Sequence, residues 1–197
     1  MKKIISLLLA VLMMLSLAAC GAGSDDKIEN AAWDELEKLG KIEVEDGKSF
    51  VSITIPADFV SNDITQESLD KDLGKEYISA TVNPDGSVTY KMTKKQHKAM
   101  LESVRKSFDT AIQELVDSPD FAFAKVDYNE DFTVFDVHLS TDELGMAESF
   151  MVLSFYVFGG AYGFFLGHEN QNITVNFYSQ SGNLLETVNS SDLANAG

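Results

Sequence analysis

An uncharged, apolar stretch in the last third of the chain constrains the fold more than any other feature. Residues 150–166 contain no charged side chain, and apolar residues fall on every side of a helix drawn through them. A helix that is hydrophobic all round must be buried on all sides or lie in a membrane. Ser140 and Glu143 have the spacing of a capping box, which predicts that a helix begins there.

Two interpretations of this stretch stay open. A membrane span needs roughly 20 apolar residues, and this one falls a little short and is interrupted by Gly159, Gly160 and Gly163. Lys and Arg normally collect on the cytoplasmic flank of a span, whereas none follows Lys125. We therefore favour a core helix packed on a sheet, with glycines that let another backbone approach.

The N-terminus carries an export signal. Residues 1–3 form a basic start, residues 4–19 are almost entirely apolar, and Leu-Ala-Ala-Cys-Gly follows at residues 17–21. This segment resembles the lipobox of bacterial lipoproteins. The resemblance implies a signal peptide over residues 1–19, a lipid (diacylglyceryl and palmitate-type) anchor on Cys20, and a position on the extracytoplasmic face of the cell membrane. Two acyl chains on one residue give stable anchoring.

The composition of the chain excludes several kinds of functional site and argues against one class of partner. Cys20 is the only cysteine, so a lipidated chain has no thiol for a disulfide, a zinc-thiolate site or a cysteine nucleophile. The 31 acidic against 15 basic residues argue against nucleic acid as a partner. After a tether over residues 20–26, we expect a single α+β globular domain over residues 27–190 and a disordered tail over residues 191–197.

The fold class follows from alternating hairpin and helix signals. Hairpins are expected over residues 42–55, 78–92, 122–139 and 173–188, and helices over residues 25–40, 65–73, 93–116 and 140–166. Thr93 and Gln96 form a capping box at the start of the third helix. Its predicted apolar stripe is Met100, Leu101, Val104, Phe108, Ala111, Ile112 and Leu115. An Asp46-Gly47 turn would place Val44 opposite Ser49, and a five-residue loop would place Val82 opposite Val88. The prediction is α+β: an antiparallel sheet of about eight strands in four hairpins, with two long and two shorter helices packed mainly on one face.

The opposite face of that sheet is expected to be polar, and whether it is a binding surface stays open. Its residues would be Ser79, Thr81, Thr89, Lys91, Asn176 and Tyr178.

No metal or cofactor site is predicted. Asp127, Asn129 and Asp131 have the opening spacing of a calcium loop, but Phe132 and His138 stand where glycine and glutamate are needed. We therefore expect a plain hairpin turn. His97, His138 and His168 have no metal-ligand spacing among themselves, and no nucleophile elbow or phosphate-binding glycine pattern occurs.

Six basic residues lie between positions 91 and 106, and two of them, Lys94 and Lys95, fall in the first turn of the expected long helix. Cations oppose the helix dipole there. One interpretation is an ordinary solvated face; the sharper hypothesis is a docking patch for an anionic partner, such as a cell-envelope polymer or an acidic protein face. The six, called the basic set below, are Lys91, Lys94, Lys95, Lys98, Arg105 and Lys106.

Residues 51–56 (Val-Ser-Ile-Thr-Ile-Pro) and 85–92 (Asp-Gly-Ser-Val-Thr-Tyr-Lys-Met), behind a lipobox, resemble surface lipoproteins of Gram-positive anaerobes. The resemblance implies no activity, and Cys20 is the only functional residue that it transfers to this chain.

We therefore expect a non-enzymatic, lipid-anchored surface protein that binds a partner or ligand. One alternative is an extracellular hydrolase whose carboxylates converge only in the fold, with Asp58, Asp63 and Asp136 as candidates. Another is a solute-binding component of a transporter, although such proteins usually close two domains around their ligand.

Overall fold

The computed structural model describes residues 43–46, 49–61, 63–168 and 171–194. The expected signal peptide, Cys20, the tether and the helix over residues 25–40 lie outside the described residues. The described chain groups into two compact units. Unit 1 comprises residues 43–107 and 164–168, and unit 2 comprises residues 108–163 and 171–194.

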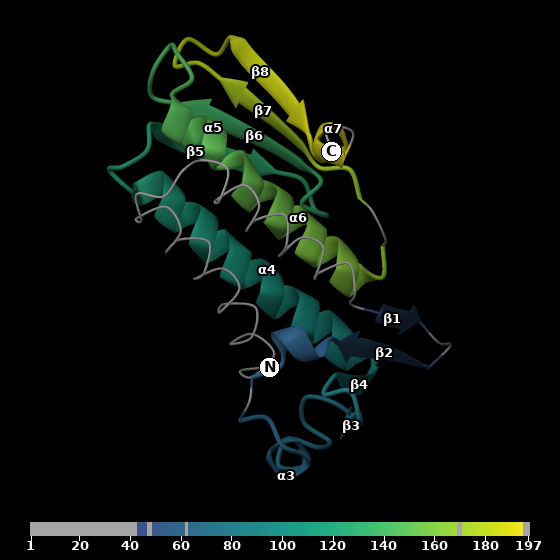
Figure 1. Cartoon of the computed structure of the whole chain (residues 1–197). Coiled ribbons are helices and arrows are strands. Elements are labelled where there is room, and N and C mark those ends of the chain that lie inside the picture. Colours follow the sequence, from purple (N-terminus) through teal and green to yellow (C-terminus); the bar gives the residue numbers. More distant parts are fainter. Residues whose placement is uncertain (1–42, 47–48, 62, 169–170, 195–197) are drawn as a thin grey trace. The chain divides into compact units, whose positions relative to one another are not determined.

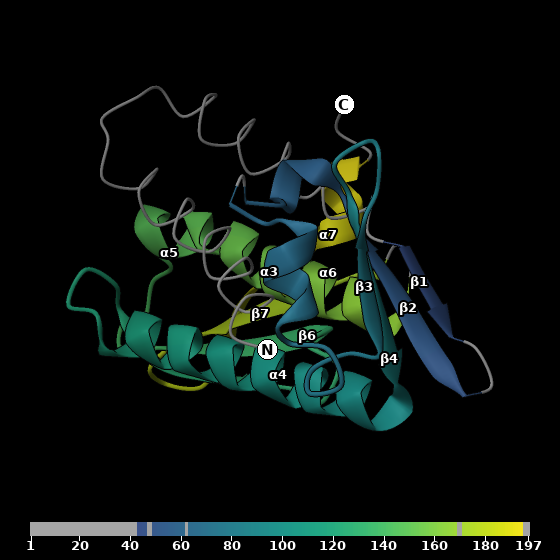
Figure 2. The same cartoon turned by 90° about the horizontal axis from the view of Figure 1, so that it is seen from below.

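Unit 1 contains a four-stranded antiparallel sheet (Figures 1 and 2). Its order is β1 (Glu43–Asp46), β2 (Phe50–Ile55), β4 (Val88–Thr93) and β3 (Ser79–Val82). Alternate residues of the two central strands are buried, as a sheet with one covered face requires. They are Val51, Ile53, Ile55, Val88, Tyr90 and Met92.

The two hairpin registers predicted for this sheet had different outcomes. Val82 does lie opposite Val88, which confirms the five-residue loop. Val44 lies opposite Ile53 and not Ser49, so the predicted Asp46-Gly47 turn is wrong. The prediction rested on the turn residues alone, whereas Asp46 pairs with Val51, so the connection between the two strands is longer than a two-residue turn.

A short helix and two tyrosines close the core of unit 1. After the 3-10 turn η1 (Ala57–Phe59), α3 (Gln66–Asp70) begins at Thr65, whose side chain accepts the N–H of Ser68. The Tyr77 hydroxyl donates to the carbonyl of Leu69, and the Tyr77 ring packs edge-on against Tyr90 with centroids 5.2 Å apart. Both rings are buried, so α3 is attached to the sheet through apolar contact and one buried hydrogen bond.

The long helix α4 (Lys94–Asp117) begins at the predicted capping box. The Thr93 hydroxyl accepts the N–H of Gln96 at 3.1 Å, and the side-chain oxygen Oε1 of Gln96 accepts the N–H of Thr93 at 2.9 Å. The predicted apolar stripe is confirmed in both units: Met100 and Val104 are buried in unit 1, and Phe108 and Ile112 in unit 2.

Unit 2 contains a second four-stranded sheet, whose strands lie side by side in sequence order (Figure 1). They are β5 (Phe123–Tyr128), β6 (Val134–Leu139), β7 (Thr174–Tyr178) and β8 (Leu184–Asn189). The β5–β6 and β7–β8 pairs are antiparallel, whereas β6 and β7 are parallel. A parallel pair needs a crossover connection, and here the crossover holds α5 (Met146–Phe150) and α6 (Val152–Leu166).

No residue of α6 is exposed, but six of its fifteen residues are only half-buried and Phe150 is exposed, so the stretch is buried in part and not on all sides. Within unit 2, Phe155 packs against Phe135 at 5.0 Å between ring centroids, and Phe158 packs against Phe108 at the same separation. The expected close approach at a glycine is also present, because a Cβ on Gly159 would collide with a backbone carbonyl oxygen. These contacts are those of a core helix packed on a sheet.

By length and composition, one helical stretch in the described chain, Met146–Leu166, could cross a membrane; its mean hydropathy is 1.6. Half of its most apolar window is buried inside the protein.

The predicted helix start at Ser140 and Glu143 is wrong. The Ser140 N–H and hydroxyl both point to the carbonyl of Ala122, at 2.8 and 3.2 Å, and so extend the β5–β6 pairing. The helix starts later, with Gly145 as the N-cap of α5. Tertiary hydrogen bonds therefore override the local capping signal.

The predicted fold is wrong in two respects. The strands form two four-stranded sheets rather than one sheet of about eight, and the parallel β6–β7 pair was not expected. Among the helices of the described residues only α4 is long, because the second predicted long helix is divided at Met151 into α5 and α6. The fold class, α+β, is as predicted. The division into two sheets was not predictable, because the sequence signals of a hairpin specify the pairing of its own two strands and not the pairing between hairpins. The single domain over residues 27–190 stays a prediction.

The predicted disordered tail from residue 191 is also wrong over its first residues. The chain continues from β8 into a short helix, α7 (Ser190–Ala194). The Ser190 hydroxyl accepts the N–H of Ile173 at 2.9 Å, and the Ser191 N–H donates to the Asn172 side chain at 3.1 Å. These bonds hold the segment beside the start of β7. Residues 195–197 lie outside the described residues.

Candidate functional site

All six residues of the basic set lie in unit 1. Lys91 is on β4, half-buried, with its ammonium 3.8 Å from the ring centroid of Phe50. On α4, Lys94, Lys95, Lys98 and Lys106 are exposed and Arg105 is half-buried. Lys94, Arg105 and Lys106 also interact with other groups of the chain.

Helix geometry places the α4 cations on one solvent-facing side. At roughly 100° per residue, Lys94, Lys98 and Arg105 fall within roughly 40° of one another. Lys95 and Lys106 form a second line roughly 90° further round, which lies opposite the buried stripe of α4, whereas the first line borders that stripe. The first line is about 16 Å long. The arrangement could meet an extended anion, although Glu102 interrupts it between the two lines.

The polar face expected for one sheet is divided between two. In unit 1, Thr54 and Thr89 share a hydrogen bond of 3.0 Å across β2 and β4. In unit 2, Asn176 donates to Asp136 at 2.8 Å and accepts from Thr187 at 2.8 Å. Within each face, these side chains therefore have hydrogen-bond partners from neighbouring strands of the same sheet.

His138 belongs to the polar face of unit 2. Its ring stacks on Tyr178 with centroids 5.1 Å apart, and its Nε2 lies 3.5 Å from a carboxylate oxygen of Asp127. The same oxygen is 2.7 Å from the ammonium of Lys125. The cluster balances its own charge and has no catalytic nucleophile among these residues.

The three carboxylates proposed for a hydrolase are not gathered within either unit. Asp58 and Asp63 are exposed in unit 1, where Asp63 accepts a hydrogen bond from Ser61, and Asp136 lies on the sheet of unit 2. Asp136 is held by the amide of Asn176, as described above. The geometry of these residues gives no support to the hydrolase alternative.

The segment with calcium-loop spacing is a turn that is stabilised by its own hydrogen bonds. The side-chain oxygen Oδ1 of Asn129 accepts the N–H groups of Thr133 and Val134 at 2.8 and 3.1 Å. Phe132, at the position where a calcium loop needs glycine, has a φ of 53° and is fully buried. Within the described ranges, no group of three or more His, Cys, Asp or Glu side chains is arranged to hold a metal ion.

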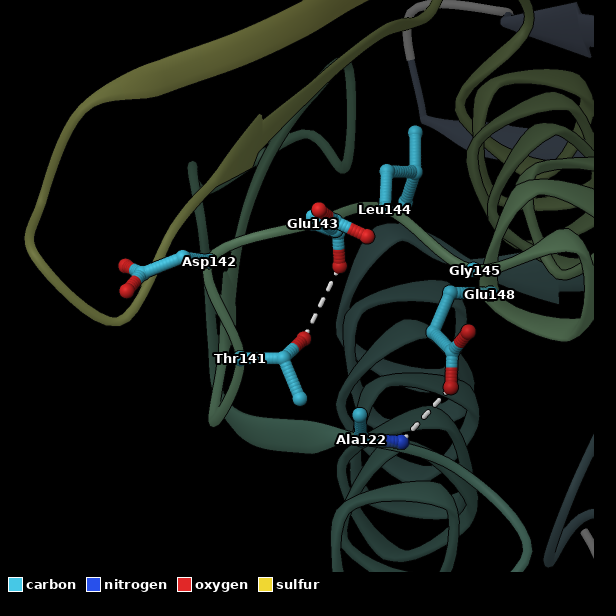
Figure 3. A pocket seen from close by; sticks show the side chains of 7 residues that line it. All are labelled: Ala122, Thr141, Asp142, Glu143, Leu144, Gly145 and Glu148. Carbon is cyan, nitrogen blue, oxygen red and sulfur yellow. Dashed lines mark hydrogen bonds between the residues drawn. The ribbon is translucent and has the colours of Figure 1, made fainter.

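Unit 2 contains an open hollow of about 510 Å³ (Figure 3). The loop between β6 and α5 forms one wall of it, and the start of β5 forms another. Its lining residues are Ala122, Thr141, Asp142, Glu143, Leu144, Gly145 and Glu148. Three of the seven are carboxylates, so the hollow is acidic.

Hydrogen bonds fix the shape of this hollow. The Asp142 carboxylate accepts the hydroxyl and the N–H of Ser181 at 2.8 and 3.3 Å. The Thr141 hydroxyl donates to the carbonyl of Glu143 at 2.9 Å, and Thr141 accepts the N–H of Gln180 through its carbonyl at 2.8 Å. The loop is therefore attached to the β7–β8 turn.

Glu148 is the buried member of the hollow. Its exposed fraction is 6%, and it reaches from α5 to accept the N–H of Ala122 at 2.7 Å (Figure 3). Sequence reasoning did not single out this residue or the hollow. The available signal was a lone Glu immediately before an uncharged stretch, which is too weak to predict burial.

No protein-family model, no curated protein and no solved structure matches the chain.

Proposed function

We propose that this chain is a lipid-anchored binding protein on the extracytoplasmic face of the cell membrane. The observation that carries the proposal is the sequence Leu-Ala-Ala-Cys-Gly at residues 17–21, after a basic start and an apolar run. Cys20 would carry the lipid, and the chain beyond the tether would face the outside of the cell.

The proposed binding surface is the basic set of unit 1, and the proposed partner is an anionic polymer of the cell envelope. The line of Lys94, Lys98 and Arg105 along α4 supports this choice, because regularly spaced cations suit an extended polyanion. The location of Lys94 and Lys95 in the first turn of α4 supports it further. Cations there oppose the helix dipole and so are not explained by helix stability.

Anchoring is tested by mass spectrometry of the N-terminal peptide of the membrane-extracted protein. We expect a peptide that begins at Cys20 and carries the mass of a diacylglyceryl group. In a Cys20→Ser variant, the acylated peptide should be absent. An unmodified Cys20, or a chain that still begins at Met1, would contradict the anchor.

Binding is tested with a charge-reversed variant and a matched control. Lys94, Lys95 and Lys98 are all changed to Glu, and the control changes Lys71, Lys75 and Lys125 to Glu for the same net charge difference. Acidic residues in the first turn favour the helix dipole, so loss of α4 would not explain a loss of binding. We expect salt-sensitive binding to isolated envelope fractions to disappear in the first variant alone. Equal binding by both variants would reject the basic set as the binding surface.

A further inference from the structure

The basic set makes one side of unit 1 positive in a chain that is acidic as a whole. Between residues 91 and 106, Glu102 is the only acidic residue, whereas the whole chain has a net charge of −16. Lys95 and Lys98 are exposed and make no ion pair with another described residue. A positive surface of this kind attracts anionic segments that are within reach.

Residues 25–40, which lie outside the described residues, are an acidic segment that is joined to unit 1. They contain six acidic and two basic residues and so have a net charge of −4. Only residues 41 and 42 separate them from β1, and β1 belongs to the same sheet as β4, which leads into α4. The charge of this segment is therefore opposite to that of the basic set, and the short connection keeps the two close together.

The dimensions allow the segment to lie along α4. Strand β1 begins opposite Thr54, near one end of β2, and the other end of β2 lies opposite Thr93, immediately before α4. The rise and spacing of strands place residue 43 about 15–20 Å from the start of α4. A helix over residues 25–40 is about 24 Å long, and the basic residues of α4 span about 18 Å. A helix attached at residue 43 therefore reaches the whole basic set.

The helix predicted for this segment has an apolar stripe with acidic margins, and α4 has a matching pattern. The stripe consists of Ile28, Ala32, Leu36 and Leu39. At roughly 100° per residue, Glu29 and Glu35 fall at its two margins. On α4, Leu101 is half-buried and falls between Lys98 and Arg105 along the helix, beside the first line. Amphipathic helices bind through an apolar stripe of this kind.

We propose that residues 25–40 dock along the first line of the basic set, with their apolar stripe against Leu101 and with Glu29 and Glu35 beside the cations. Single exposed ion pairs contribute little, but attachment to the same chain gives the segment a high effective concentration at this surface. One consequence rests on the proposed function: an anionic polymer of the envelope has to displace the segment. The docking itself depends neither on the polymer nor on the lipid anchor.

Trp33 makes the docking measurable, because it lies in this segment and is the only tryptophan in the chain. The fluorescence of the full-length chain is recorded in detergent at low ionic strength. We expect Trp33 emission at a shorter wavelength than that of a solvated tryptophan, and protection from quenching by acrylamide. Added salt should shift the emission to the red and increase quenching, because the ion pairs are screened. Long-chain polyphosphate, as a model polyanion, should have the same effect at constant ionic strength.

Charge variants localise the docking. The variant with Lys94, Lys95 and Lys98 changed to Glu should show the red-shifted emission without added salt. The matched control, with the other three lysines reversed as described above, should emit like the unchanged chain. Adding Glu29→Lys and Glu35→Lys to the first variant reverses both partners, so the emission should return towards the blue.

The proposal is overturned if Trp33 emits alike in the charge-reversed variant and in the unchanged chain, as it would if the detergent held it. It is also overturned if the doubly reversed chain shows no recovery, or if the emission depends on protein concentration, which would place the segment on a second copy. Should the charge-reversed variant fail to fold, as judged by circular dichroism, Glu29→Lys with Glu35→Lys alone decides, because it must release Trp33. Envelope binding is measured separately, so either proposal can fail while the other stands.

Discussion

At the residue scale, Gly159 shows how closely α6 is packed in unit 2. A Cβ at this position would collide with the carbonyl oxygen of Phe132 and lie 2.5 Å from Cγ1 of Ile173. Neither neighbour can move freely, because Phe132 and Ile173 are buried. Gly163, one turn later, differs: a Cβ there would lie 2.8 Å from the side-chain amide of Gln171, which is the end of a flexible side chain.

Gly159→Ala should lower the free energy of unfolding by about 1–3 kcal/mol, because overpacking forces the backbone to shift. Gly163→Ala should be closer to neutral, since the amide can move and alanine favours the helix. Urea denaturation midpoints at unchanged m-value measure both effects. Equal stability of the two variants would mean that α6 is not packed as described.

Three buried tyrosines make the stability of the fold depend on pH. Burial raises the pKa of Tyr77, Tyr90 and Tyr156 from 10.0 to about 12, with smaller contributions from nearby acidic residues at Tyr77 and Tyr156. A pKa that is raised on folding means that the folded state holds the proton more tightly. The stabilisation is therefore complete below pH 10 and is lost as the pH rises towards 12.

Chemical denaturation at pH 9 and above pH 11 should show this loss. Tyr90→Phe should reduce the difference between the two pH values, because one of the three titrating groups is removed. A midpoint that is independent of pH over this interval, with tyrosinate absorbance appearing near pH 10, would contradict the assigned burial.

At the element scale, the two predicted capping boxes show when local sequence decides where a helix begins and when tertiary hydrogen bonds decide it. Both Thr93–Gln96 and Ser140–Glu143 have the required spacing. Only the first caps a helix, because the hydroxyl and N–H of Ser140 are taken by the carbonyl of Ala122.

Thr93→Ala should therefore cost about 0.5–2 kcal/mol of unfolding free energy, the usual effect of losing an N-cap. Ser140→Ala should change it by less than about 0.5 kcal/mol, because the backbone N–H still satisfies the same carbonyl. Thermal melts of both variants against the unchanged chain provide the comparison. A larger effect at Ser140 than at Thr93 would reverse the assignment.

The difference between local and tertiary interactions also explains how much of the fold the sequence predicts. The second hairpin, α4 and its buried stripe follow from neighbouring residues, so local patterns were enough. The parallel β6–β7 pair joins segments on either side of α6, and no local pattern specifies it. The acidic hollow was missed for a similar reason. Ala122 and Glu148 are 26 positions apart and meet only when β5 and α5 are in place.

At the scale of the whole molecule, the account depends on where Met146–Leu166 resides. This stretch is apolar enough to cross a membrane, yet its buried face packs on the sheet of unit 2. If the chain is tethered only at Cys20, everything after the tether lies outside the cell. If the stretch crosses the membrane, the residues after it lie on the other side.

Protease treatment of intact protoplasts that carry the full chain with a C-terminal epitope tag decides between these arrangements. Our account predicts that external protease removes the tag without lysis, because β7, β8 and the C-terminus are extracytoplasmic. A tag that survives until the membrane is opened would show that Met146–Leu166 is a second anchor and would contradict the tethered fold proposed for this chain.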